Sequence, residues 1–362
     1  MSIAAMRMEE GKPSAREVLA CYIAVIYCFF GRVGRNPIMN ANLPLVRLLE
    51  RRTRALKRHL AAAVKGDGTG VHQARVASRR LREAVPLLTE GLHGTKAGKA
   101  RRKIRKITRA LGAVRELDVT LHLIDELASK PGVPRPALAD VRAHVIEARE
   151  QRREVMLERL KDVDTDKLDR RLASVRDALR QPMPTHHNWR SVLSSRVAAR
   201  GRRLSEAIHE AGQIYAPEAL HRVRIATKKL RYAVELADES GAVPSAILVR
   251  TLRKVQDTLG RLHDLQVVQH HVAEVGAAPQ GHSTPDAGLA ILTRLIEDEC
   301  RHLHGRYVTM LPDLLDAVEK ARHEVVVRLR VPSRARSAKM TLATRRRPLA
   351  AESRASRKAG RR

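Results

Sequence analysis

Two segments of this sequence place a histidine and a row of basic side chains at the same spacing. The first, VHQARVASRRLREAVPLL, begins at Val71, and the second, LHRVRIATKKLRYAVELA, begins at Leu220. A guanidinium group presents a planar fork to phosphate or carboxylate oxygens, and an ammonium group adds a point charge. Histidine can donate a hydrogen bond when neutral and gains a charge when a phosphate raises its pKa. These residue types therefore predict recognition of an anion.

The two segments align position by position at an offset of 149 residues. The aligned residues are His72, Arg75, Arg79, Arg80 and Arg82 in the first copy, and His221, Arg224, Lys228, Lys229 and Arg231 in the second. A further block follows each copy, and its Leu111-Gly112 and Leu259-Gly260 pairs align at an offset of 148. A change of one residue over such a distance indicates a duplicated unit, which can present two positive surfaces to one long anion.

Helical periodicity sorts each copy into a basic stripe and an apolar face. At about 100° per residue, Arg75, Arg79 and Arg82 lie within an arc of roughly 80° from His72. The second copy and the helices of the following blocks repeat this division, although Asp257 stands where a counterpart of Arg109 is expected. The block residues assigned to the stripes are Arg102, Arg105, Lys106, Arg109, Arg250, Arg253 and Lys254.

The stripes contain almost no glutamate that would form ion pairs one turn away. A solvated basic face explains most single runs of charge. Four stripes in duplicated register favour the alternative, an anion that lies on them.

The charge balance points to a polyanionic partner. The chain has 362 residues, a net charge of +31 and an isoelectric point near 11.2. Residues 333–362 carry eleven Lys/Arg and one Glu, so +21 remains on the rest of the chain. Only eight Phe, Trp and Tyr are present, whereas proteins that bind single-stranded nucleic acid use aromatic stacking platforms. The composition therefore favours a polyanion without bases.

The elements that must position these stripes are helices, because helical periodicity runs through nearly the whole chain and no period-2 run appears. We expect an all-α fold of two antiparallel four-helix bundles. In the first half, helices are expected at about 43–64 and around His72. A long third helix is expected to end at about 128, a fourth is expected to end at about 160, and a shorter one is expected at 166–180. In the second half they are expected at 191–212, around His221, at 246–275, and from about 286 with a shift at Pro312. The linker QPMPTHHN separates the halves, 43–180 and 190–331.

Both ends of the chain fall outside this plan. Residues 1–42 form an extension that contains the apolar run Val18–Phe30, which is too short for a comfortable membrane span. Three interpretations stay open for this extension: a dispensable segment or a start at Met39, a docking helix, and a membrane-directed segment. Residues 332–362 read as a disordered basic tail. With three cysteines in no disulfide pattern, a cytoplasmic protein is expected.

Catalytic and metal sites are not expected. His302 and His304 follow an acidic run without a known ligand pattern, and the adjacent pairs His270-His271 and His186-His187 cannot share one helix face. Glu116, Asp118 and Asp264 are expected to cap helices or form ion pairs rather than act as acids or bases.

The doubled pattern H-x-x-R-[VI]-x-x-[RK]-[RK]-L-R, followed by L-G-x-x-[RH]-[DE], resembles the conserved histidine α-helical domain family, CHAD. The resemblance spans roughly 43–329. It implies two pseudo-symmetric four-helix bundles around a basic cavity that binds inorganic polyphosphate without catalysis, with the stripe residues as contacts. The sequence departs from the family at Arg115-Glu116 and at His263-Asp264. The triphosphatase activity of an associated family is not implied, because its E-x-E-x-K motif is missing.

We therefore expect a polyphosphate-binding protein without a cofactor that attaches to polyphosphate or storage granules. The main alternative is a nucleoid-type, non-specific DNA-binding protein that also uses the basic tail. An enzyme that acts on phosphorylated substrates is a third class.

Overall fold

The computed structural model describes residues 42–330 except 66, 91, 93–94, 182–188 and 278–285. Every element within these residues is helical, with no strand among them, which confirms the all-α prediction. The expectations for residues 1–41 and for the tail from 331 fall outside the described residues.

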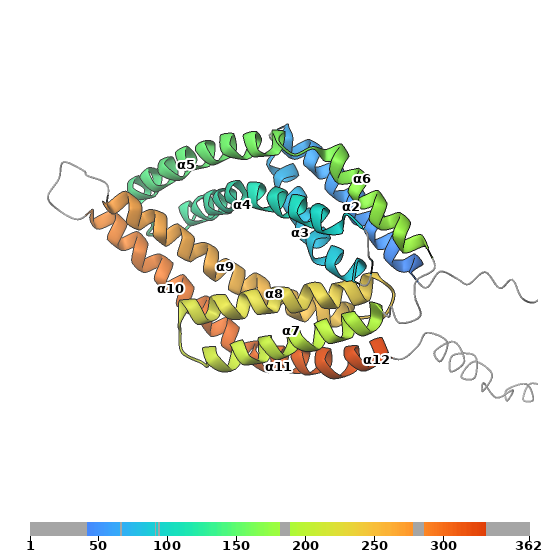
Figure 1. Ribbon diagram of the computed structural model, residues 1–362. Helices are drawn as coiled ribbons and strands as arrows, with labels where there is room; N and C mark the ends of the chain where they lie inside the picture. Colours follow the sequence, from blue (N-terminus) through green and yellow to red (C-terminus); the bar gives the residue numbers. More distant parts are fainter. Residues whose placement is uncertain are drawn as a thin grey trace, which may run out of the picture.

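Among the described residues, the first half of the chain has five helices (Figure 1). They are α2 (Leu43–Val64), α3 (Gly68–Leu88), α4 (Ala97–Ala128), α5 (Arg135–Lys161) and α6 (Thr165–Arg180). Their bounds agree closely with those expected from periodicity. Pro86 lies in the last turn of α3, which ends two residues later.

The second half contains helices in the same order. They are α7 (Trp189–Ala211), α8 (Pro217–Glu239), α9 (Ala246–Ala277), α10 (Ala287–Thr309), α11 (Leu311–Lys320), the π-helical turn η1 (Ala321–Val325) and α12 (Val326–Arg330). Counterparts have similar lengths: α4 and α9 both have 32 residues, and α2 and α7 have 22 and 23. This order is compatible with duplication, and the arrangement as two four-helix bundles stays a prediction.

Helix α3 begins with Gly68, Thr69 and Gly70, which form its first turn. Asp67 caps this helix, since its carboxylate accepts hydrogen bonds from the backbone N–H groups of Thr69 and Gly70, both at 3.0 Å. Gly70 also lies against α2, where a Cβ atom would come within 2.8 Å of the Ala62 backbone. Glycine therefore permits the close approach of α2 and α3.

The apolar faces expected from the helical wheel form the core. Leu81 and Val85 of α3 and Leu230 and Val234 of α8 are almost completely buried. Within each half, consecutive helices pack against one another from α2 to α5 and from α7 to α10. The halves meet through α4, α5 and α3, which contact α9, α10, α7 and α8.

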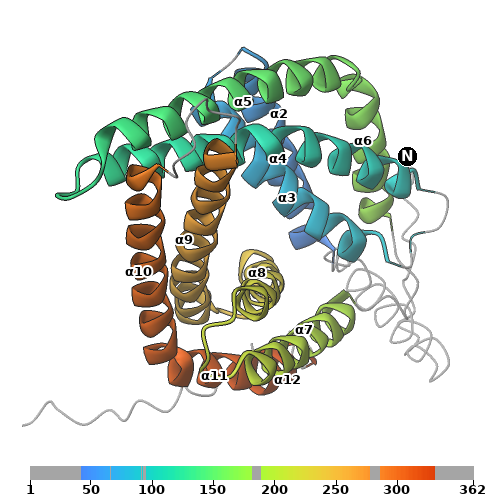
Figure 2. The same ribbon diagram turned by 90° about the vertical axis from the view of Figure 1, so that its left-hand side faces the viewer.

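Helices α3 and α8 occupy the interior of this arrangement. Figure 2 shows them near the middle, with α4 and α5 on one side, α9 and α10 on another, and α7, α11 and α12 on a third. The stripe residues of α3 and α8 therefore belong to helices in the interior of the arrangement.

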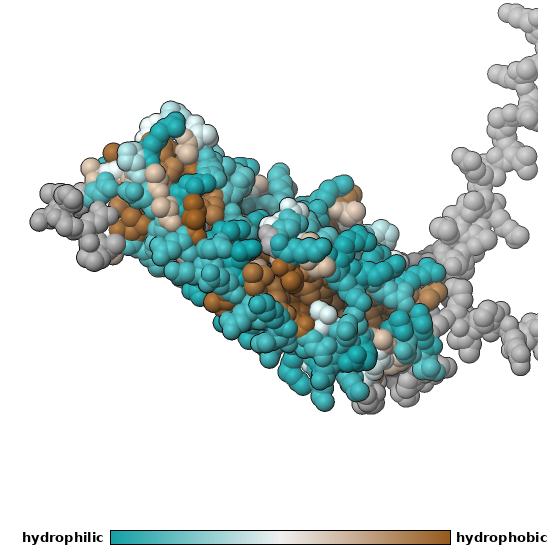
Figure 3. All heavy atoms as spheres, turned by 90° about the horizontal axis from the view of Figure 1, so that it is seen from above, coloured by the Kyte–Doolittle hydropathy of each residue, from teal (hydrophilic) through white to brown (hydrophobic). Residues whose placement is uncertain are grey.

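The outer surface seen from above is mainly hydrophilic, with limited hydrophobic stretches (Figure 3). No helix in the described ranges is long and apolar enough to cross a membrane. The apolar run Val18–Phe30 is not among the residues that this search covers.

Candidate anion-binding site

The basic stripes of α3 and α8 face each other across the contact between these two helices. Lys228 of α8 is half-buried, and burial together with the positive charges of Arg79, Arg224 and Arg75 lowers its pKa to about 7. Arg82 adds to the same effect. Cations from both copies of the motif are thus gathered in one cluster, which we call the central cluster: Arg75, Arg79, Arg82, Arg224 and Lys228.

Two arginines at equivalent positions carry guanidinium donors without partners. The Nε atoms of Arg75 and Arg224 are buried and have no hydrogen-bond partner among the described residues. Arg75 Nη1 donates to the carbonyl oxygen of Gly112 at 3.0 Å, so this side chain also ties α3 to α4. Burial, followed by the charge of Arg79, lowers the pKa of Arg75 to about 10. An unsatisfied buried donor costs free energy that an anionic acceptor would recover.

Three carboxylates partly balance the central cluster. Glu83 lies 3.6 Å from Arg82, although it also pairs with Arg200 at 2.7 Å. Burial and the nearby Glu116 raise the pKa of Asp264, while Arg224 opposes this shift. Glu116 and Asp264 lie inside α4 and α9, so they cap no helix, and the capping alternative was wrong for both. Asp118 forms an ion pair with Arg149 at 2.7 Å, as the ion-pairing alternative proposed.

His72 and His221, which stand at equivalent positions in the two copies of the motif, lie at the margin of the central cluster. Burial and the charge of Arg115 lower the pKa of His72, and burial and the charge of Arg224 lower that of His221. The His221 ring lies 4.7 Å from the His263 ring between centroids, and burial with Arg224 lowers the pKa of His263 to about 4. These imidazoles are therefore mainly neutral at pH 7 in the free protein.

A cavity of about 1100 Å³ opens beside this margin. His221, His263 and Glu116 line one part of it, and its lining also includes residues of α5, α9 and α10. The cavity gives a ligand access to the histidine end of the central cluster.

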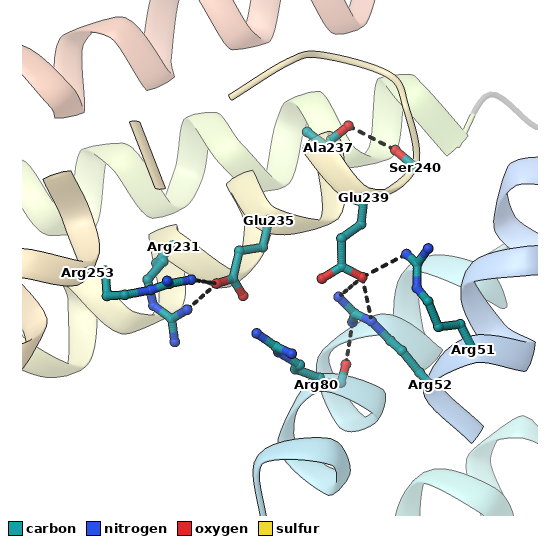
Figure 4. A network of polar contacts seen from close by, with 9 residues as sticks. All are labelled: Arg51, Arg52, Arg80, Arg231, Glu235, Ala237, Glu239, Ser240 and Arg253. Atoms are coloured by element: carbon teal, nitrogen blue, oxygen red, sulfur yellow. Dashed lines mark hydrogen bonds and ion pairs between the residues drawn. The ribbon is translucent and has the colours of Figure 1, made fainter. Parts of the chain in front are cut away.

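Arg231, Glu235 and Arg253 belong to a separate network, shown in Figure 4. Arg231 is 7% exposed and forms an ion pair with Glu235 one turn away in α8. It also donates to Gln256 Oε1 at 2.8 Å, and Arg253 lies 3.6 Å from the same glutamate. The expectation that stripe cations lack glutamate partners was therefore wrong for Arg231 and Arg253, and also for Arg82, which lies 3.6 Å from Glu83.

Arg80 lies at the other end of this network. Its backbone carbonyl accepts a hydrogen bond from Arg52 at 2.6 Å, and its side chain extends toward Glu235 (Figure 4). Arg51 and Arg52 of α2 pair with Glu239 of α8 at 3.0 and 3.2 Å. These contacts join the two halves of the chain and leave Arg80 and Arg231 outside the central cluster.

Several predicted residues of the following helices lie in a different pocket. Arg102, Lys106 and Arg109 line a basic pocket of about 690 Å³ between α4, α5 and α6, together with Arg159 and Arg171. Lys229 lines a third pocket beside α7. Arg105, Arg250 and Lys254 are exposed. The predicted residues thus divide between the central cluster and separate surfaces.

The predicted site residues did not include Arg115 or His263. The charge of Arg115 contributes to the lowered pKa of His72, and His221 contributes to the lowered pKa of His263. Both stand at the [RH] position of the block that follows Leu-Gly. Their alignment was the available signal, since they occupy the same place in each copy.

Comparisons with known proteins agree with this architecture. The family model described as CHAD domain matches residues 47–273. The crystal structure of the CHAD domain from the plant Ricinus communis is similar, with a TM-score of 0.50 and 22% identity over 78% of this chain and 91% of that chain. PptA from Streptomyces chartreusis is also similar, with a TM-score of 0.52 and 16% identity over 78% and 98%. Among curated proteins, none matches the chain.

Proposed function

This chain belongs to the CHAD domain family, and from that premise we propose that it binds inorganic polyphosphate without catalysing a reaction on it. The family is associated with polyphosphate binding. The proposal rests on one observation above all: cations from α3 and α8 are packed together with buried guanidinium donors that lack acceptors.

The chemistry of the ligand fits this cluster. A linear polyphosphate carries a negative charge at every repeat, so it can contact cations from both helices at once. Arginine forks bind phosphate oxygens in a bidentate manner, and a phosphate beside Lys228 favours its charged form. Binding would therefore remove the repulsion among Arg75, Arg79, Arg224 and Lys228 that the free protein tolerates.

We propose binding without catalysis, because positive charge and hydrogen-bond donors are the groups that are needed to bind a polyanion. We propose further that the protein acts in the cytoplasm and attaches to polyphosphate or storage granules. A flexible polyphosphate chain suits half-buried side chains between two helices.

The competing function is non-specific DNA binding through the same cations and the basic tail. A duplex is too wide to place its phosphates against half-buried side chains between α3 and α8. Base-free polyphosphate also fits the low aromatic content of the chain.

Competition at fixed ionic strength tests the proposal. Fluorescently labelled polyphosphate is bound to the full chain and displaced with unlabelled polyphosphate or duplex DNA at equal phosphate concentration. We expect polyphosphate to displace the probe at least tenfold more effectively. Equal or better displacement by DNA would favour the competing function.

A further inference from the structure

A group of metal-ligating side chains lines the large cavity on the side formed by α5 and α9. His271 Nδ1 lies 2.7 Å from Glu274 Oε2, and His144 Nε2 lies 3.2 Å from the same oxygen. The two rings are 5.6 Å apart between centroids, and one ligand atom from each residue lies within 4.8 Å of the others. We call these three residues the His-His-Glu group.

The group combines one local spacing with one long-range contact. His271 and Glu274 are three residues apart, so they lie on one face of α9. His144 comes from α5, which packs against α9 although it belongs to the first half of the chain. The adjacent pair His270-His271 was expected not to share a metal, because adjacent residues do not lie on one helix face. His144 is 127 positions from His271 in the sequence, so no local spacing connected the two.

The pairing of Glu274 is unusual for so basic a chain. Its carboxylate contacts His144, His271 and, at 3.3 Å, His270, and no lysine or arginine among the described residues pairs with it. Every side chain that pairs with Glu274 within the described residues is therefore a histidine, whose neutral ring nitrogen can also bind a metal ion.

A second histidine–glutamate pair provides a contrast. His122 and Glu126 of α4 lie 3.2 Å apart at i,i+4 spacing, but Glu126 also pairs with Arg261 at 2.7 Å. An arginine on the carboxylate repels a cation, and no second histidine contacts this pair in the described residues. His122 and Glu126 therefore lack the ligand set that His144, His271 and Glu274 share.

Geometry and access suit a transition-metal ion. Tetrahedral Zn²⁺ binds ligand atoms at about 2.0–2.1 Å, which places them roughly 3.3 Å from one another. Glu274 Oε2 lies 2.7 Å from His271 Nδ1 and 3.2 Å from His144 Nε2, which is close to that separation. Small side-chain rotations would therefore bring the three ligand atoms into tetrahedral positions. The His271 side chain is 12% exposed, whereas His144 and Glu274 are 38% and 42% exposed, so an ion can enter from the cavity.

We propose that His144, His271 and Glu274 bind a divalent transition-metal ion such as Zn²⁺. Two imidazoles and a carboxylate favour this class over Mg²⁺ and Ca²⁺, which prefer oxygen ligands. The ion would link α5 of the first half to α9 of the second half. It would also add positive charge to the cavity that His221 and His263 line. This proposal does not depend on polyphosphate binding.

Isothermal titration of the full chain, without an affinity tag, with ZnCl₂ and with MgCl₂ tests the site in the absence of polyphosphate. We expect one Zn²⁺ site that Mg²⁺ does not fill. His144→Ala, His271→Ala and Glu274→Gln should each weaken Zn²⁺ binding at least tenfold, and His122→Ala should leave it unchanged. Glu274→Gln preserves side-chain shape, so its effect does not depend on a cavity left by truncation.

Zn²⁺ should also raise the melting temperature of the wild-type chain and of His122→Ala, but not that of Glu274→Gln. Zn²⁺ binding that is absent, or that survives Glu274→Gln and His271→Ala unchanged, would overturn the proposal. Because polyphosphate is not in the assay, failure here leaves the proposed function standing.

Discussion

Lys228 of α8 lies within electrostatic reach of Arg79 of α3, its counterpart in the other copy of the motif, 149 residues away. Both side chains are half-buried, and burial together with the positive charge of Arg79 disfavours the charged form of Lys228. Folding places these like charges together at a cost that grows as water is excluded. Such an arrangement is typical of a site prepared for an anion.

The first prediction concerns the central cluster. Arg79→Gln with Lys228→Gln should weaken polyphosphate binding at least 100-fold, because each charge-assisted hydrogen bond contributes roughly 1.5–3 kcal/mol. The ligand-free variant should be at least as stable as the wild type, because two repelling charges are gone. Fluorescence titration and urea denaturation measure the two effects.

The matched control for this variant is Arg294→Gln with Arg306→Gln on α10, which removes the same net charge from exposed positions. We expect its affinity to change less than about threefold, since exposed charges distant from the ligand act weakly. If both double variants lose affinity equally, net charge and not the cluster determines binding.

The second prediction is a pH dependence of binding. The pKa of Lys228 is about 7 in the free protein and should rise when phosphate binds. The complex then holds more protons than the free protein above pH 7, so affinity should fall as pH rises from 7. Calorimetry at pH 8 in two buffers with different ionisation enthalpies should show proton uptake on binding.

Lys228→Arg provides the control, because arginine stays charged across this range. This variant should bind at pH 8 at least as tightly as the wild type and take up fewer protons. The pKa values of His72 and His221 are also lowered. The decrease in polyphosphate affinity with rising pH that these histidines cause should therefore remain in this variant at lower pH. Identical proton uptake in wild type and Lys228→Arg would contradict the assignment to Lys228.

The third prediction separates structure from binding at Arg231. Glu235→Gln should lower the free energy of unfolding by about 3 kcal/mol, because it leaves a buried arginine without its charged partner. Polyphosphate affinity of the folded variant should stay within about threefold of wild type. Chemical denaturation and titration of the same preparation measure both quantities.

Replacing both partners, Arg231→Met with Glu235→Leu, should restore much of the lost stability, since no buried charge is left unpaired. A large loss of polyphosphate affinity in this folded double variant would place Arg231 in the binding site after all.

The fourth prediction concerns the basic pocket between α4, α5 and α6. Arg102→Gln, Lys106→Gln and Arg109→Gln together should leave the affinity for short polyphosphate nearly unchanged, because these side chains line a pocket apart from the central cluster. Titration with a short chain checks this. A loss as large as that of the Arg79/Lys228 variant would show that the two surfaces act as one site.

The fifth prediction concerns the basic tail. Truncation after Val331 removes about a third of the net charge and keeps every residue of the central cluster. A basic tail attracts any polyanion electrostatically, so truncation should reduce DNA affinity by a larger factor than polyphosphate affinity. Both ligands are titrated at one ionic strength. Loss of polyphosphate binding with retained DNA binding would support the competing function.

The sequence determined the helices and the face of each helix that carries the cations. Helical periodicity is a local property, so it predicted the helix at 43–64 and the apolar faces opposite the stripes, where Leu81 and Leu230 are buried. The ion pair of Arg231 with Glu235 is also local, since the two residues are four positions apart. The sequence pattern did not predict it, because that pattern considered the cations only.

Only the tertiary structure decided which faces meet. Periodicity shows that Arg79 and Lys228 each lie on a basic stripe, but the packing of α3 against α8 brings those stripes together. The packing of α4 with α5 and α6 places Arg102 and Arg109 in another pocket, and the packing of α5 against α9 brings His144 to His271. The reason is physical: side-chain spacing along one helix fixes its own faces, whereas contacts between helices distant in sequence depend on how all the apolar faces are buried at once.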